Sequence, residues 1–143
     1  MQHTVPVVSH ELVGNVMKAI QGEYNAIHFY EKLAALAPTD QIRKRILDIR
    51  EDEMEHFKGF SHLYTCLTGQ QFYPQITEPM PTNFQNGVVV AFHDEQETSD
   101  FYLTVSREVY YDPHIREEFR YNAADEQRHA VWFLYFMNHS WQS

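Results

Sequence analysis

Four long stretches of this chain carry apolar side chains three and four positions apart, the spacing that keeps them on one face of an α-helix. In the first stretch, for example, Val16, Ile20, Ile27 and Ala34 fall on one stripe. No stretch shows the convincing alternation of apolar and polar residues that is typical of a strand. We therefore predict an all-α fold, with helices at residues 9–37, 40–68, 83–111 and 113–139.

Residues that start or stop helices stand near these boundaries. Thr39 can cap the second helix, and Pro38 and Gly69 can end the first and second helices. The sequence TNFQ at residues 82–85 fits a capping box in which the threonine is the N-cap of the third helix. These signals support four separate helices.

The lengths of the connections predict how the helices pack. The links between helices 1 and 2 and between helices 3 and 4 are short, so each pair should form an antiparallel hairpin. The fourteen residues 69–82 can span roughly 46–50 Å, and a helix of 28 residues is about 42 Å long. This segment can therefore run the length of the bundle and bring helix 3 parallel to helix 2. An up-and-down bundle with a long loop is the alternative.

Length and composition narrow the class of protein. The 143 residues suit a single domain, residues 1–143. The formal net charge of −9 argues against a nucleic-acid surface, which needs clusters of Lys and Arg. The sequence shows no apolar run long enough to span a membrane and no signal peptide. Cys66 is the single cysteine, so no internal disulfide can form, and we expect a cytoplasmic protein.

The pattern Asp-Glu-x-x-His occurs twice, as DEMEH at residues 52–56 and as DEQRH at residues 125–129. On a helix, a Glu and a His three positions apart lie on the same face, one turn from each other. Glu53 and Glu126 also fall on the apolar stripes of their helices. Both carboxylates are therefore expected to point into the interior.

The other two predicted helices each place a further Glu on the apolar stripe. Glu23 lies 30 residues before Glu53, and Glu95 lies 31 residues before Glu126. A tyrosine follows Glu23 and Glu95 at the same offset of seven residues. The chain thus consists of two similar helical hairpins, each of which supplies a Glu, a Tyr and an Asp-Glu-x-x-His sequence.

Six acidic and imidazole side chains are therefore expected to face one another inside the bundle. They are Glu23, Glu53, His56, Glu95, Glu126 and His129. A buried carboxylate is strongly unfavourable unless it is neutralised, paired or bound to a metal. No Lys or Arg occupies these stripe positions, and two divalent cations would balance the four carboxylates. Ligands with oxygen and nitrogen atoms but no thiolate favour iron or manganese over structural zinc.

This arrangement resembles the ferritin-like di-iron carboxylate proteins, and in particular the rubrerythrin branch, in which two helices supply a Glu and two supply Glu-x-x-His. The resemblance covers about residues 9–139 and implies a ferritin-like four-helix bundle with one long crossover between helices 2 and 3. It implies that Glu53 and Glu126 bridge two iron ions. The other four candidates would be terminal ligands in two pairs, Glu23 with His56 and Glu95 with His129.

The resemblance also implies roles for residues around the ligands. Asp52 and Asp125 are expected to hydrogen-bond the ligand histidines of the facing hairpin, which fixes the tautomer of each imidazole and raises its basicity. Tyr30 and Tyr102 are expected to hydrogen-bond the terminal carboxylates.

Two departures from the rubrerythrin pattern bear on the reaction. A single cysteine cannot build the four-cysteine rubredoxin module, so an external electron donor is required. Thr98 stands where peroxidase-type rubrerythrins carry an additional Glu, one turn after the ligand of helix 3. Glu97 is the alternate ligand, and it would turn inward only if a π-bulge lay between it and Tyr102.

From these observations we expect a di-iron oxidoreductase that reacts with hydrogen peroxide or dioxygen and is reduced by a separate donor. Two alternatives stay open: a ferroxidase or other iron-handling protein, and a non-catalytic bundle in which Zn or Mn only adds stability. The resemblance also implies a homodimer. Nothing in the sequence predicts a nucleic-acid or membrane partner.

Overall fold

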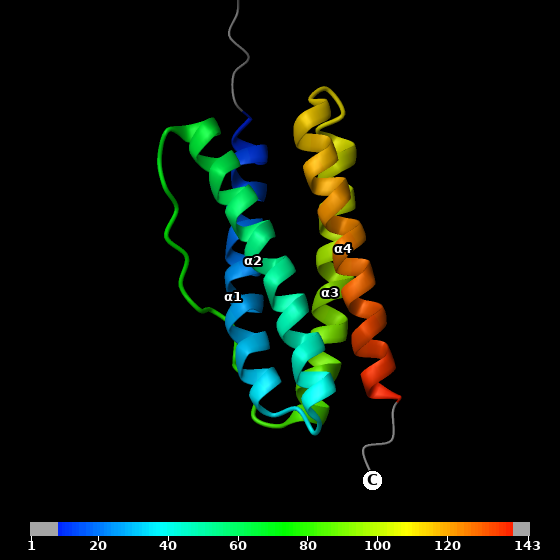
Figure 1. Cartoon of the computed structure of the whole chain (residues 1–143). Helices are drawn as coiled ribbons and strands as arrows, with labels where there is room; N and C mark the ends of the chain where they lie inside the picture. Colours follow the sequence, from blue (N-terminus) through cyan, green and yellow to red (C-terminus); the bar gives the residue numbers. More distant parts are fainter. Residues whose placement is uncertain (1–8, 139–143) are drawn as a thin grey trace, which may run out of the picture.

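The computed structural model describes residues 9–138, and this part of the chain folds into four α-helices without any strand (Figure 1). The helices are α1 (His10–Ala35), α2 (Asp40–Thr68), α3 (Phe84–Glu108) and α4 (Pro113–Met137). The prediction of an all-α four-helix bundle is confirmed. Within the described residues, no helix is both long enough and apolar enough to cross a bilayer.

The helices begin at capping side chains, with one correction to the sequence prediction. The Ser9 hydroxyl oxygen accepts a hydrogen bond from the backbone N–H of Leu12 at 3.3 Å. In α3 the N-cap is Asn83 and not Thr82, because Oδ1 of Asn83 accepts from the N–H of Asn86 at 2.9 Å. Asparagine is at least as good an N-cap as threonine, so the helix starts one residue later than the capping box predicts.

Two helix ends differ from the predicted boundaries. α1 ends at Ala35 and not at residue 37, because Pro38 disfavours helical backbone at the residue that precedes it. α3 ends at Glu108 and not at residue 111, because the next three residues form a turn before the N-cap of α4. The predicted end of the fourth helix, at residue 139, lies outside the described residues.

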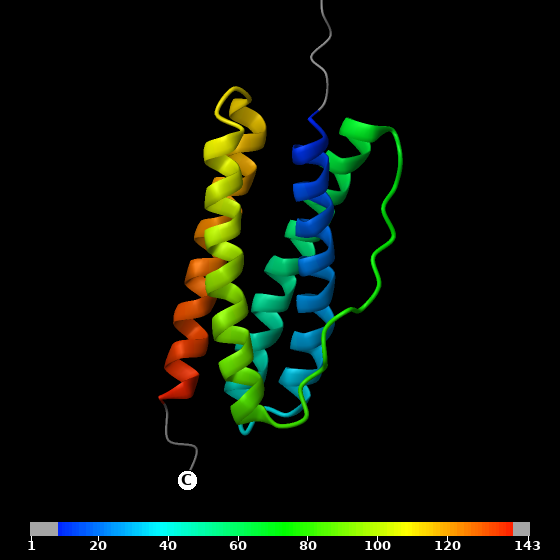
Figure 2. The ribbon, with the colours of Figure 1, turned by 180° about the vertical axis from the view of Figure 1, so that it is seen from behind.

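α1 packs against α2 and α3 packs against α4 as two antiparallel hairpins, which lie side by side (Figures 1 and 2). In both views α2 and α3 run in the same direction, and the crossover segment, residues 69–83, extends along the outside of the bundle. Asn25 of α1 holds this segment through Thr77: its Nδ2 donates to the Thr77 hydroxyl at 2.9 Å, and its Oδ1 accepts from the Thr77 N–H at 3.0 Å. Nε2 of Gln21 donates to the Gln75 carbonyl at 2.6 Å.

The apolar core is divided into two clusters, one on each side of a buried polar layer. The first cluster contains Phe60 and Phe119, and the second contains Ile46 and Phe133. All four of these side chains have no exposed surface. Every helix contributes one or two side chains to the polar layer. The hydrophobic packing on both sides fixes the helices and therefore holds these side chains in place.

Candidate metal centre

Six acidic and imidazole side chains lie between the two core clusters, and they are called here the central layer. Its members are Glu23, Glu53, His56, Glu95, Glu126 and His129. None of them is more than 4% exposed. α1 and α3 each contribute one Glu, whereas α2 and α4 each contribute a Glu and a His one turn apart on the same face. The structure thus brings together all six candidate ligands that helical periodicity placed on the inner faces.

The central layer forms two groups of four side chains that could each hold a metal ion. The first group is Glu23, Glu53, His56 and Glu126. The second group is Glu53, Glu95, Glu126 and His129. Within each group, one ligand atom from every side chain lies within 4.8 Å of the others. Because Glu53 and Glu126 belong to both groups, their carboxylates lie between the two positions, where a bridging ligand would stand.

The inward-facing atoms of the central layer make no hydrogen bond of good geometry. They contact only one another: Nδ1 of His56 lies 2.9 Å from Oε1 of Glu126, and Nδ1 of His129 lies 3.2 Å from Oε1 of Glu53. Among the side chains of residues 9–138, seven buried nitrogen or oxygen atoms are unpaired, and six of them belong to this layer. Each member of the layer contributes one such atom: Glu23 Oε2, Glu53 Oε1, His56 Nδ1, Glu95 Oε2, Glu126 Oε1 and His129 Nδ1. Unpaired buried polar atoms are strongly unfavourable and rare in folded proteins. A set that converges in this way fits the coordination of cations.

The outward-facing nitrogens of both histidines are paired with aspartates of the other hairpin. Nε2 of His56 lies 2.8 Å from Oδ2 of Asp125, and Nε2 of His129 lies 2.8 Å from Oδ2 of Asp52. Such a partner keeps the proton on Nε2 and leaves Nδ1 free to bind a metal. The guanidinium of Arg128 lies 2.6 Å from Oδ1 of Asp125 and 3.6 Å from Oδ2 of Asp52. One arginine therefore covers both aspartates on the α2/α4 face.

Two buried tyrosines hold the carboxylates contributed by α1 and α3. The Tyr102 hydroxyl donates to Oε1 of Glu23 at 2.6 Å, and the Tyr30 hydroxyl donates to Oε1 of Glu95. Each tyrosine thus reaches across to the Glu of the other hairpin. In each of these two carboxylates, one oxygen is held by a tyrosine and the second oxygen remains unpaired.

Three of the four carboxylates of the central layer have raised pKa values and so resist ionisation in the absence of a cation. Burial and the charge of Glu53 raise the pKa of Glu23 to about 8. Burial and the same charge also raise the pKa of Glu95, and they hold the pKa of Glu126 well above its ordinary value. Burial acts to raise the pKa of Glu53 too, but the hydrogen bond and charge of His129 outweigh it and lower that pKa.

The two imidazoles hold their protons more strongly than usual. Burial disfavours the charged ring, but the hydrogen bond to Asp125, together with the contacts and charges of Glu23 and Glu53, outweighs it and raises the pKa of His56 to about 10. In the same way, the hydrogen bond to Asp52, together with the interactions with Glu53 and Glu95, outweighs burial and raises the pKa of His129 to about 12. Protons therefore neutralise the central layer of the metal-free chain, and a metal ion must displace them to bind.

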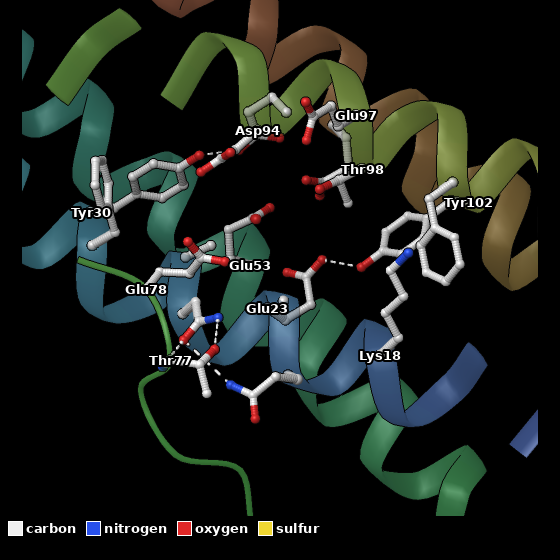
Figure 3. Close-up of a pocket in the computed structure, with 18 residues that line it drawn as sticks. Lys18, Glu23, Tyr30, Glu53, Thr77, Glu78, Asp94, Glu97, Thr98 and Tyr102 are labelled. Carbon is white, nitrogen blue, oxygen red and sulfur yellow. Dashed lines mark hydrogen bonds between the residues drawn. The ribbon is translucent and has the colours of Figure 1, made fainter. Parts of the chain in front are cut away.

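The carboxylate side of the central layer opens into a cavity of about 350 Å³ between α1 and α3 (Figure 3). Figure 3 shows Tyr30 and Tyr102 on opposite sides of this cavity, with Glu23 and Glu53 directed towards its middle. Glu78 of the crossover segment lines the cavity as well. Four charged and exposed residues surround the opening: Lys18, Glu78, Asp94 and Glu97.

The structure places Glu97 at this opening and in neither of the two ligand groups. α3 is a regular α-helix from Phe84 to Glu108, so no π-bulge turns Glu97 inward. The side chain is exposed, and Thr98 occupies the position one turn after Glu95. The candidate ligand that α3 contributes to these two groups is therefore Glu95.

Sequence reasoning missed three features of the site. Arg128 stands three residues after Asp125, a spacing that allows a helical ion pair, but its contact with Asp52 depends on how the hairpins pack. Asn25 and Thr77 lie 52 residues apart, and no local pattern marks them as partners. The cavity arises from the packing of α1 against α3 and likewise has no signature in the sequence.

Comparisons with known proteins agree with this architecture. No protein-family model matches the chain. A hypothetical protein from Pyrococcus furiosus has a similar solved structure, with a TM-score of 0.76 over 94% of both chains, and at 19% identity this likeness shows a shared fold. The protein YhjR of Bacillus subtilis (strain 168) is 48% identical over 126 residues, which cover 88% of this chain and 86% of YhjR. The chain therefore belongs to the same protein family as YhjR.

Proposed function

We propose that this protein is a dinuclear iron protein that reduces hydrogen peroxide or dioxygen with electrons from a separate donor. The observation that carries the proposal is the set of six unpaired, buried ligand atoms, one from each member of the central layer. Four carboxylates and two neutral imidazoles carry a formal charge of −4, which two divalent ions would cancel. Apolar clusters lie on both sides of the layer, so bound metal ions would replace the protons that neutralise it in the metal-free chain.

The chemistry of the ligands favours iron as the metal. Two groups that share two carboxylates match the design of ferritin-like di-iron proteins, and the resemblance to rubrerythrins rests on the same residues. Manganese would accept the same ligands. Structural zinc sites usually have four ligands rich in cysteine and histidine, whereas each group here contains three carboxylates and one histidine.

Iron bound in pairs would supply two electrons, and reduction of one hydrogen peroxide to two waters consumes two electrons and two protons. The protein's own residues prepare the site for this reaction. Asp52 and Asp125 orient the imidazoles, so Nδ1 of each ring faces the centre. Tyr30 and Tyr102 hold one oxygen of each outer carboxylate and leave the other oxygen free to bind.

The test is elemental analysis of natively purified protein, followed by optical spectra of the Fe(II)-loaded protein before and after peroxide is added without oxygen. We expect two iron ions per chain and a new absorption of Fe(III) after peroxide. A Glu53→Gln/Glu126→Gln variant should bind no iron pair. A matched variant with two exposed acids replaced, Glu51→Gln/Glu117→Gln, should behave like the wild type. Bound iron that peroxide leaves as Fe(II) would overturn the proposed reaction.

Two other functions would give different results. Iron storage requires a large shell or an encapsulated assembly with a mineral core, which native mass measurement detects. If Zn or Mn served only to stabilise the fold, a redox-inert metal would raise the melting temperature of the protein, and no turnover would be observed.

We infer a cytoplasmic homodimer, in which exposed aromatic side chains such as Tyr121 would be covered by the partner.

A further inference from the structure

The opening of the α1/α3 cavity carries an excess of negative charge. Glu78 reaches it from the crossover segment, and Asp94 and Glu97 reach it from α3. Glu78 and Glu97 lie close enough to act on the charge of Asp94. Lys18 is the cation among the residues that line the cavity, and its ammonium group lies over the Phe101 ring at 4.2 Å. Three carboxylates against one ammonium give the opening a net charge of −2.

The inner end of the same cavity consists of ligand atoms that have no partner. Glu23 and Glu95 are each 1% exposed, and both line the cavity. One oxygen of each carboxylate is buried and unpaired. The acidic residues at the opening and the unpaired carboxylate oxygens of Glu23 and Glu95 therefore line the same cavity, and a cation could pair with both. A water molecule occupies about 30 Å³ of liquid, so the volume of about 350 Å³ leaves room for a cation with its water ligands.

The opposite face of the central layer offers no comparable path in the described part of the chain. There the histidine Nε2 atoms are bonded to Asp52 and Asp125, and Arg128 lies across both aspartates. Its positive charge would repel a cation that approached from the α2/α4 side. The two ends of the layer are closed by apolar side chains, among them Phe60 and Phe133.

We propose that divalent cations reach the centre through the α1/α3 cavity, and that Glu78, Asp94 and Glu97 form a transient cation-binding site at its opening. The inference rests on the proposed function, because it assumes that the central layer binds metal. The three carboxylates raise the local concentration of cations and pass them on to Glu23 and Glu95. Electrostatic attraction of this kind raises association rates by roughly tenfold to a thousandfold at low ionic strength.

The experiment measures how fast metal-free protein takes up Co²⁺, followed by the absorption that Co²⁺ gains on binding. The variant is Glu78→Gln/Asp94→Asn/Glu97→Gln, in which all three replaced side chains are exposed and none belongs to the central layer. We expect uptake at low salt to slow by about tenfold. The final occupancy should stay at two ions per chain. The difference in rate should shrink as salt screens the charges.

Two further variants, the first of them matched in net charge to the cavity variant, separate the local effect of the opening from the effect of net charge. Glu11→Gln/Glu108→Gln/Glu117→Gln removes the same charge from exposed positions that do not line the cavity, and it should take up Co²⁺ at the wild-type rate. Lys18→Met removes the ammonium from the opening and should accelerate uptake. If the first control slows uptake as much as the cavity variant does, the effect is one of net charge and the inference fails.

The outcome also distinguishes this inference from the proposed function. Wild-type protein that takes up no Co²⁺ and no iron would overturn both. Wild-type protein that takes up two ions per chain, with no change in rate in the cavity variant, would overturn the access route alone. Thermal unfolding followed by circular dichroism checks that each variant folds like the wild type.

Discussion

His56 of α2 and Asp125 of α4 belong to different hairpins, and their Nε2 and Oδ2 atoms lie 2.8 Å apart. His129 and Asp52 make the reciprocal contact at the same distance. Each hairpin therefore supplies a candidate ligand, a histidine, whose orientation depends on the other hairpin.

The first prediction concerns this pairing. Asp125→Asn should weaken metal binding by the group that contains His56 by about 10- to 100-fold, because the amide no longer fixes the tautomer of the imidazole or supports its basicity. The group that contains His129 should bind almost as before. Isothermal titration with Co²⁺ would resolve the two steps. Asp52→Asn should have the opposite effect, weakening the group that contains His129 and sparing the group that contains His56. Equal losses of affinity at both groups in either variant would contradict this account.

The shared carboxylates should matter more than the unshared ones. Glu53→Gln removes a ligand from both groups, so we expect it to abolish the binding of a metal pair. Glu23→Gln removes a ligand from one group and should leave about one ion per chain. Elemental analysis after dialysis counts the ions. A Glu23 variant that loses both ions, or a Glu53 variant that keeps both, would show that the carboxylates are not shared in this way.

Tyr102→Phe should destabilise the protein. The substitution leaves Oε1 of the buried Glu23 without its hydrogen bond, a loss that is expected to lower the free energy of unfolding by about 1–3 kcal/mol. Urea unfolding of the metal-free protein measures this change. Tyr110 is 72% exposed, and Tyr110→Phe should have no effect. Metal content should be retained in the Tyr102 variant, because the tyrosine is not itself a ligand.

The metal-free protein should become less stable as the pH rises. The folded-state pKa values of Glu23 (about 8), His56 (about 10) and His129 (about 12) all lie above the ordinary values of 4.5, 6.5 and 6.5. The folded chain therefore binds more protons than the unfolded chain from about pH 5 to pH 8 and above. The stabilisation is complete below the unfolded-state pKa of each group and is lost as the pH rises towards its folded-state pKa. Each extra proton lowers stability by about 1.4 kcal/mol per pH unit.

Thermal unfolding at several pH values, with and without metal, checks this prediction. The melting temperature of the metal-free protein should fall between about pH 5 and pH 8. Metal binding releases the same protons, so the advantage of the metal-bound form should widen over that range. A metal-free melting temperature that rises over the same range would contradict the raised pKa values.

Local pattern in the sequence was enough to predict the helices and the residues on their inner faces. The 3.6-residue period fixes which side of a helix Glu23 or His129 occupies, whatever the rest of the chain does. Glu97 shows the limit of such reasoning, because a π-bulge would have turned it inward and the sequence does not determine whether one forms. The contact between Arg128 and Asp52 depends on the distance between α2 and α4, which only tertiary packing determines. The path of the crossover segment likewise depends on Asn25, a residue far away in the chain.

The central layer interrupts the apolar core across the whole width of the bundle. A single substitution that replaces one of its six members by an apolar residue leaves the buried hydrogen-bond partner of that side chain unsatisfied, as Tyr102 would be without Glu23. Stepwise loss of the layer would therefore pass through chains that bury unsatisfied polar groups, unless several side chains changed almost at once to ones that fill the same space. Under the proposed function, the same layer would tie the stability of the fold, and not only its reaction, to a supply of metal ions.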